Sequence, residues 1–208
     1  MSPIPVHLAV EDDLSEAVIR RLLLHTGRDY AIGMVFGRGD FGYLRTRANN
    51  FNAAAASGTP ILLLTDLDQH PCPSGLMDDW LDIEAHANLV FRVAVREVES
   101  WLLADREGFA DFLGIDVVNI PLQPDQVADP KRSLVNLARR SRSRMLRESI
   151  VPRRGSTAVQ GPDYNGCIGE FVRNEWNPDA ATHCSPSLGR AWGRLISFEP
   201  DWSQPELD

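Results

Sequence analysis

Short apolar runs alternate with longer amphipathic segments along the first half of the chain. Four runs are rich in aliphatic and β-branched residues and are bounded by polar or glycine-containing segments, a pattern typical of buried strands. The predicted strands cover residues 5–10, 30–36, 61–65 and 89–95.

Segments with apolar residues near helical spacing separate these runs. The predicted helices cover residues 15–25, 43–56, 76–81, 97–104 and 109–113. Strands that alternate with helices favour a mostly parallel sheet with helices on both of its faces. We therefore predict an α/β fold for this half of the chain.

The strand signal fades beyond residue 113, where Pro121, Pro124 and Pro130 punctuate a loop. Further helices are predicted over residues 131–140, 164–176 and 188–196. We expect an α/β core over residues 1–114 and a basic helical C-terminal extension over residues 115–208 that packs on this core.

Charge is distributed unevenly along the chain. The 208 residues carry a formal net charge of −8, yet residues 131–154 carry +8 and residues 1–130 carry −11. A basic block in an acidic chain is typical of a phosphate-binding surface. The alternative is a solvated helix face that pairs with the acidic remainder of the chain.

Several classes of protein are disfavoured by the composition. The longest apolar runs are far shorter than the roughly 20 residues of a membrane-spanning helix, and no basic and apolar leader begins the chain. We therefore expect a cytoplasmic protein without a membrane segment. Cys72, Cys167 and Cys184 form no C-x-x-C pair, which argues against a disulfide framework and against a zinc ribbon.

Carboxylates follow three of the predicted strands: Glu11 the first, Asp66 and Asp68 the third, Glu97 and Glu99 the fourth. Parallel strands bring these positions to one edge of the sheet, where α/β proteins bind their ligands. In an extended chain the side chains of Asp66 and Asp68 would point the same way and could share one ion. Oxygen ligands alone suit Mg²⁺ or Mn²⁺. Helix capping is the alternative role of each single acid.

The chain also resembles Toprim-fold proteins. Residues 10–16 (VEDDLSE) resemble the first Toprim motif, and residues 66–68 (DLD) resemble the D-x-D motif. Four further segments resemble an uncharacterised Toprim-like family that is associated with bacterial ATPase operons and phage defence: residues 95–105, 129–131, 161–165 and 185–188. More distantly, the chain is similar to nucleases of the overcoming-lysogenization-defect type.

The resemblance implies a role for each acid. Glu11 would serve in acid–base chemistry or bind a metal ion, Asp66 and Asp68 would bind Mg²⁺, and Glu97 or Glu99 would complete the site. The glycine that usually follows the first Toprim glutamate is replaced by Asp12.

These features predict a Mg²⁺-dependent or Mn²⁺-dependent nuclease that cuts DNA or RNA, with a role in defence against phages or mobile elements. The residues expected to contact the nucleic-acid backbone are Lys131, Arg132, Arg139, Arg140, Arg142 and Arg144. The extra charge of Asp12 favours an alternative, a Toprim-derived subunit that binds an ATPase partner or nucleic acid without cutting. A metal-dependent phosphatase acting on a small nucleotide is a third hypothesis.

Overall fold

The computed structural model describes residues 3–37, 39 and 42–203. Its internal contacts divide the chain into two compact units. The first comprises residues Met1–Val93 and Arg190–Asp208, and the second comprises residues Ala94–Gly189. Each unit is therefore described in its own frame.

The first unit is built on a four-stranded parallel sheet in the order β2-β1-β3-β4. The strands are β1 (Ile4–Val10), β2 (Tyr30–Gly37), β3 (Ile61–Asp66) and β4 (Leu89–Ala94). β3 is almost fully buried, and β1 is buried from Leu8 to Val10, which explains the apolar runs in these two central strands. The predicted α/β class with a parallel sheet is confirmed.

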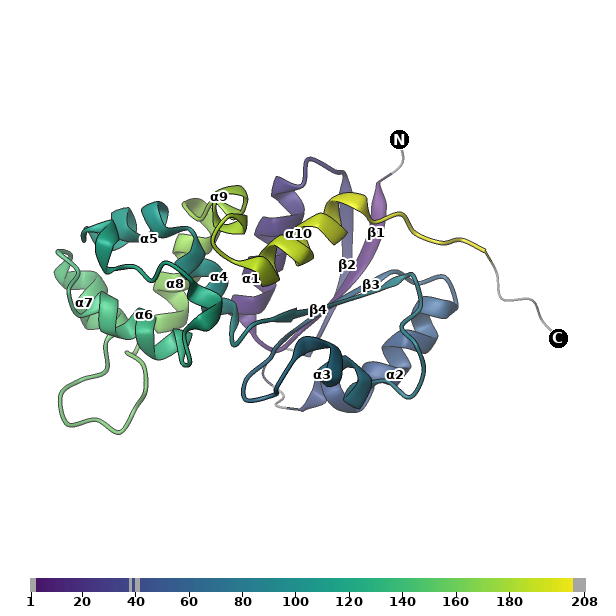
Figure 1. Ribbon diagram of the computed structural model, residues 1–208, viewed down its shortest axis with the longest axis horizontal. Coiled ribbons are helices and arrows are strands. Elements are labelled where there is room, and N and C mark those ends of the chain that lie inside the picture. The colour runs from purple at the N-terminus through teal and green to yellow at the C-terminus, as the bar shows by residue number, and fades with distance from the viewer. Residues whose placement is uncertain (1–2, 38, 40–41, 204–208) are drawn as a thin grey trace. The chain divides into compact units, whose positions relative to one another are not determined.

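Helices cover both faces of this sheet. Figure 1 shows α1 (Asp13–His25) and α10 (Pro186–Ser197) on one face, and α2 (Tyr43–Ala56) and α3 (Pro73–Trp80) on the other. The division between the units falls inside α10, so the helix belongs to the first unit only from Arg190 onward. Buried aliphatic side chains such as Leu22 on α1 and Leu62 on β3 form the core.

Gly37 allows β2 to end close beside β1. Its φ angle is 105°, and a Cβ atom at this position would lie 2.2 Å from the carbonyl oxygen of Val10. Only glycine fits such a close approach. Two residues later, the amide of Gly39 donates a hydrogen bond of 2.8 Å to the carbonyl oxygen of Glu11, so this glycine-rich segment fixes the backbone at the end of β1.

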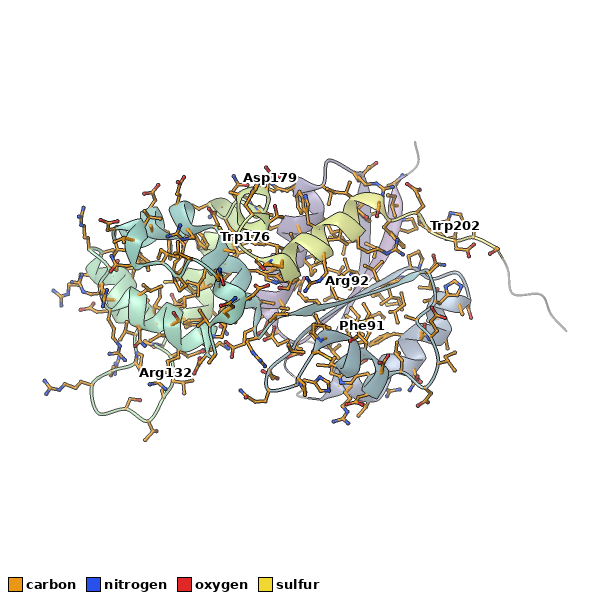
Figure 2. All side chains as sticks on the ribbon, in the orientation of Figure 1. Phe91, Arg92, Arg132, Trp176, Asp179 and Trp202 are labelled. Atoms are coloured by element: carbon orange, nitrogen blue, oxygen red, sulfur yellow. The ribbon has the colours of Figure 1, made fainter. Side chains whose placement is uncertain are left out.

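The second unit is helical. Its helices are α4 (Val98–Ala104), α5 (Arg106–Leu113), α6 (Pro130–Ala138), α7 (Arg144–Ile150), α8 (Tyr164–Asn174) and α9 (Pro178–Thr182), with short 3-10 helices η1 (Val117–Asn119) and η2 (Pro124–Gln126). Its core contains Trp101, whose Nε1 donates a 2.7 Å hydrogen bond to Ser187, and Trp176, which Figure 2 shows inside the helical unit. None of the described helices has the length and apolar composition needed to cross a membrane.

The expected helical C-terminal region is present, but the division between the units differs from the expected boundary at residue 114. α4 and α5 follow the sheet in sequence, yet they belong to the helical unit, because α4 packs against α6 and α9. Residues 190–208 return to the sheet unit. The short helices α7 and α9 were not predicted, because one or two turns carry too little periodicity to be recognised.

Asp105 connects two helix starts in the second unit. It is 3% exposed, its Oδ1 accepts a hydrogen bond from the amide of Gly108 (3.2 Å), and its Oδ2 accepts one from the amide of Asn177 (2.8 Å). We expect Asp105→Ala to lower the free energy of unfolding by about 2–3 kcal/mol, because two backbone N–H groups at helix starts lose their acceptor. Urea unfolding followed by circular dichroism measures the loss.

Two variants accompany this measurement. Asp105→Asn keeps only one acceptor oxygen, so its loss should be smaller than that of the alanine variant. Asp111→Ala on the exposed face of α5 should change stability by less than about 0.5 kcal/mol. Equal stability of the wild type and Asp105→Ala would contradict the capping role.

Candidate functional site

A cavity of about 330 Å³ lies where β1 and β3 end in the first unit. Glu11, Asp66 and Asp68 all line this cavity. Parallel pairing of β1 and β3 places the carboxyl ends of both strands at the same edge, as the sequence predicted. The structure thus brings together three of the five carboxylates expected at the site.

Glu11 is held in a defined orientation. Its Oε1 accepts hydrogen bonds from the hydroxyl of Thr65 and from the amide of Asp66, the latter at 3.2 Å. Its Oε2 makes no hydrogen bond with a described residue. Burial raises the pKa of Glu11 above its usual range, the two hydrogen bonds oppose this shift, and the charges of Asp68 and Asp12 add to it. Glu11 is therefore a fixed carboxylate with one oxygen available to a ligand.

The sequence predicted an extended chain from Asp66 to Asp68. The structure differs, because the backbone turns between the two residues. Asp66 is the last residue of β3, whereas Asp68 has a φ angle of 49°, in the left-handed region. Aspartate is one of the few residues other than glycine that adopt this region readily. The chain turns here, so the two side chains reach the cavity from different backbone directions.

Asp12 has the capping role that suits an acid at the end of a strand. It is the N-cap of α1, and its Oδ1 accepts a hydrogen bond of 2.8 Å from the amide of Ser15. The positive end of the helix dipole partly compensates the charge of an N-cap carboxylate. The extra acid beside Glu11 is therefore explained by capping.

The cavity is also lined by residues that were not predicted from the sequence to belong to the site. Arg45, His70, Asp79 and Trp80 line it, and Nε2 of His70 lies 3.1 Å from Oδ2 of Asp79. The ring of Trp80 packs on Phe91 of β4 with 5.5 Å between centroids. Arg45 lies on α2, His70 between β3 and α3, and Asp79 and Trp80 on α3, so no short motif links them to Glu11.

The arrangement of the possible metal ligands shows which kind of metal ion the cavity could hold. Among the described residues, no group of three or more His, Cys, Asp or Glu side chains is arranged to hold a metal ion. Mg²⁺ keeps several of its water ligands and is often bound by only one or two carboxylates together with substrate phosphates. Oε2 of Glu11, with Asp68 near enough to raise the pKa of Glu11, fits such a hydrated ion through one of its water ligands.

Glu97 and Glu99 belong to the second unit, around the start of α4. Glu99 is 1% exposed, and its Oε1 lies 2.9 Å from the hydroxyl of Tyr164 and 3.3 Å from Nζ of Lys131. Glu97 accepts a 2.8 Å hydrogen bond from the amide of Lys131 and lines a cavity of about 610 Å³. Burial raises the pKa of Glu97. Of the two, Glu97 is the carboxylate that a ligand can reach within this unit.

The basic residues that the sequence predicts to contact nucleic acid lie on α6, on α7 and between them. Five are exposed: Arg132, Arg139, Arg140, Arg142 and Arg144. Arg144 pairs with Glu148 at 2.7 Å, whereas the other four form no ion pair with a residue that the structure describes. Arg132, which Figure 2 labels, lines cavities on two sides of α6. These four arginines fit an interaction surface better than a helix face paired with acids.

Comparison with known proteins gives no match: no family model, no curated protein and no solved structure matches this chain. The Toprim-like resemblance therefore stays a prediction from the sequence.

Proposed function

We propose that the chain is a Mg²⁺-dependent or Mn²⁺-dependent phosphodiesterase that acts on nucleic acid. The observation that carries this proposal is the cavity at the ends of β1 and β3, which Glu11, Asp66 and Asp68 line together. A cluster of oriented carboxylates at this edge of a parallel sheet suits metal-assisted hydrolysis of a phosphodiester.

Glu11 is the proposed general base. The hydroxyl of Thr65 and the amide of Asp66 hold its Oε1, so its Oε2 can accept the proton of a water molecule that attacks the phosphorus. A raised carboxyl pKa brings a base nearer to the operating pH, which favours proton transfer. When bound, the divalent ion supplies charge stabilisation at the phosphate and the leaving oxygen.

The basic residues of the second unit would bind the substrate backbone. Arg132, Arg139, Arg140 and Arg142 are exposed and unpaired with acids in the part of the chain that the structure describes. Guanidinium groups bind phosphate oxygens bidentately and without regard to base sequence. We place Lys131 at the rim of this surface, because it lines the 610 Å³ cavity while its Nζ remains paired with Glu99.

A cleavage assay tests the proposal. Labelled single-stranded and double-stranded DNA and RNA are incubated with Mg²⁺, Mn²⁺ or EDTA, and the wild type is compared with Asp66→Ala/Asp68→Ala. We expect metal-dependent cutting that EDTA and the double substitution abolish. A folded wild-type protein that cuts none of these substrates would refute the nuclease proposal.

A second candidate is a Toprim-derived subunit that binds an ATPase partner or nucleic acid without cutting it. The lack of a three-carboxylate metal group among the described residues favours this reading. It predicts nucleic-acid or partner binding that is unchanged by EDTA and by substitution of Asp66 and Asp68. The ATPase partner and the role in phage defence rest on the sequence resemblance.

A further inference from the structure

Arg92 occupies an unusual position for an arginine. It lies in β4, a strand at the edge of the sheet whose neighbouring residues are apolar and buried. Successive side chains of a strand point to opposite faces, and Phe91 packs on Trp80 of α3. Figure 2 shows Arg92 on the other side of β4, toward α10.

The guanidinium of Arg92 has no partner among the described residues. Its Nε is shielded from solvent and makes no hydrogen bond. The residue as a whole is partly exposed, and its terminal nitrogens form neither a hydrogen bond nor an ion pair with a described residue. A charged group is rarely enclosed in this way unless a counter-ion or hydrogen-bond acceptor meets it.

The charged groups that act on Arg92 have the same sign. Arg190 and Arg194 are four residues apart on α10, so they share one face of that helix. Arg190 is exposed, and its side chain forms no hydrogen bond or ion pair with a described residue, while Nη2 of Arg194 donates a 2.9 Å hydrogen bond to the carbonyl oxygen of Ala87, in the segment that leads into β4. Burial lowers the pKa of Arg92, and the charges of Arg194 and Arg190 lower it further.

This arrangement costs folding free energy as it stands. Burying a cation is unfavourable, and two like charges nearby add to the cost. An anion between the three side chains would remove both effects, because guanidinium groups donate several hydrogen bonds in a fixed fork. A tetrahedral oxyanion has enough acceptor oxygens to meet three such forks at once.

We propose that Arg92, Arg190 and Arg194 form a binding site for a tetrahedral oxyanion, either a free phosphate ion or the terminal phosphate of a small molecule. This site is separate from the acidic cavity, since Arg92 faces away from the side of β4 on which Phe91 meets Trp80. It does not depend on the proposed nuclease activity.

Isothermal titration calorimetry and thermal unfolding test the site. The full chain is titrated with inorganic phosphate in EDTA at fixed ionic strength, with chloride as the reference anion. EDTA prevents phosphate from binding through a metal ion in the acidic cavity. We expect phosphate to bind with a Kd between about 1 μM and 1 mM and to raise Tm relative to chloride.

Variants assign the binding to these arginines. Arg92→Met should weaken phosphate binding by about tenfold or more, since it removes the central charge. Arg190→Gln should weaken phosphate binding about fivefold. Because Arg190 is exposed on α10, this variant tests the site even if Arg92→Met does not fold. Arg47→Met on the exposed face of α2 and Glu11→Gln in the acidic cavity should bind phosphate as the wild type does.

A nucleoside monophosphate distinguishes the two sources of the oxyanion. Binding that is tighter than that of inorganic phosphate indicates a small phosphorylated molecule, and equal binding indicates the ion alone. The proposal is overturned if the wild type does not distinguish phosphate from chloride, or if Arg92→Met and Arg190→Gln both bind phosphate as well as the wild type does.

Discussion

Replacing Glu11 with glutamine should lower metal-dependent cleavage about 10³-fold, because the variant loses the proposed general base. The folded protein should be at least as stable as the wild type. The amide oxygen of glutamine can still accept hydrogen bonds from Thr65 and from the amide of Asp66. The substitution also removes a partly buried negative charge that lies near Asp68 and Asp12.

Two measurements separate these effects. Single-turnover cleavage at saturating Mg²⁺ gives the activity of Glu11→Gln, and urea unfolding in EDTA gives its stability. Glu84→Gln is the matched control, since it makes the same chemical change at an exposed position of the same unit. A glutamine variant that cleaves at the wild-type rate would exclude Glu11 as the base and leave Asp66 or Asp68 as candidates.

Removing three charges from the basic surface should weaken nucleic-acid binding strongly. We expect the triple variant Arg132→Gln, Arg139→Gln, Arg140→Gln to bind single-stranded oligonucleotides about 10–100-fold more weakly near 100 mM salt. The slope of log K against log salt should become shallower by about 2, since each neutralised contact to a single strand contributes about 0.7. Fluorescence anisotropy across a salt series measures both quantities.

The control for this experiment is Arg144→Gln, because Arg144 is the arginine of this set that already pairs with an acid, Glu148. Its substitution should change affinity far less than the triple variant does. Affinity and salt slope that are unchanged in the triple variant would show that nucleic acid binds elsewhere. If such a variant also kept full hydrolytic activity, a phosphatase for small nucleotides would become the better hypothesis.

The two experiments together distinguish the functional hypotheses. A nuclease requires both the carboxylates and the arginine surface. A binding subunit requires the arginines or a partner surface but tolerates Glu11→Gln. A small-molecule phosphatase requires the carboxylates and tolerates the triple arginine variant. Each hypothesis therefore predicts a different pair of outcomes.

The strands and helices of the sheet unit could be predicted from the sequence alone. Strands β3 and β4 are mostly buried, so both are rich in apolar residues, and the amphipathic helices between the strands carry a clear period. The same order of elements required parallel strands and thus placed Glu11 with Asp66 and Asp68 at one edge. The expectation of an extended chain from Asp66 to Asp68 was wrong, because the left-handed backbone at Asp68 leaves no periodic signal in the sequence.

The surroundings of these acids, and the unit to which each segment belongs, depend on tertiary contacts that the sequence pattern does not contain. The contacts of Thr65 with Glu11 and of α4 with α6 and α9 join residues that are far apart in the chain. The enclosed, unpaired Nε of Arg92 is likewise visible only once β4 and α10 are folded. Burial and the charges of neighbours are properties of the folded chain. Local pattern therefore predicted secondary structure, whereas the chemistry of each site depended on long-range packing.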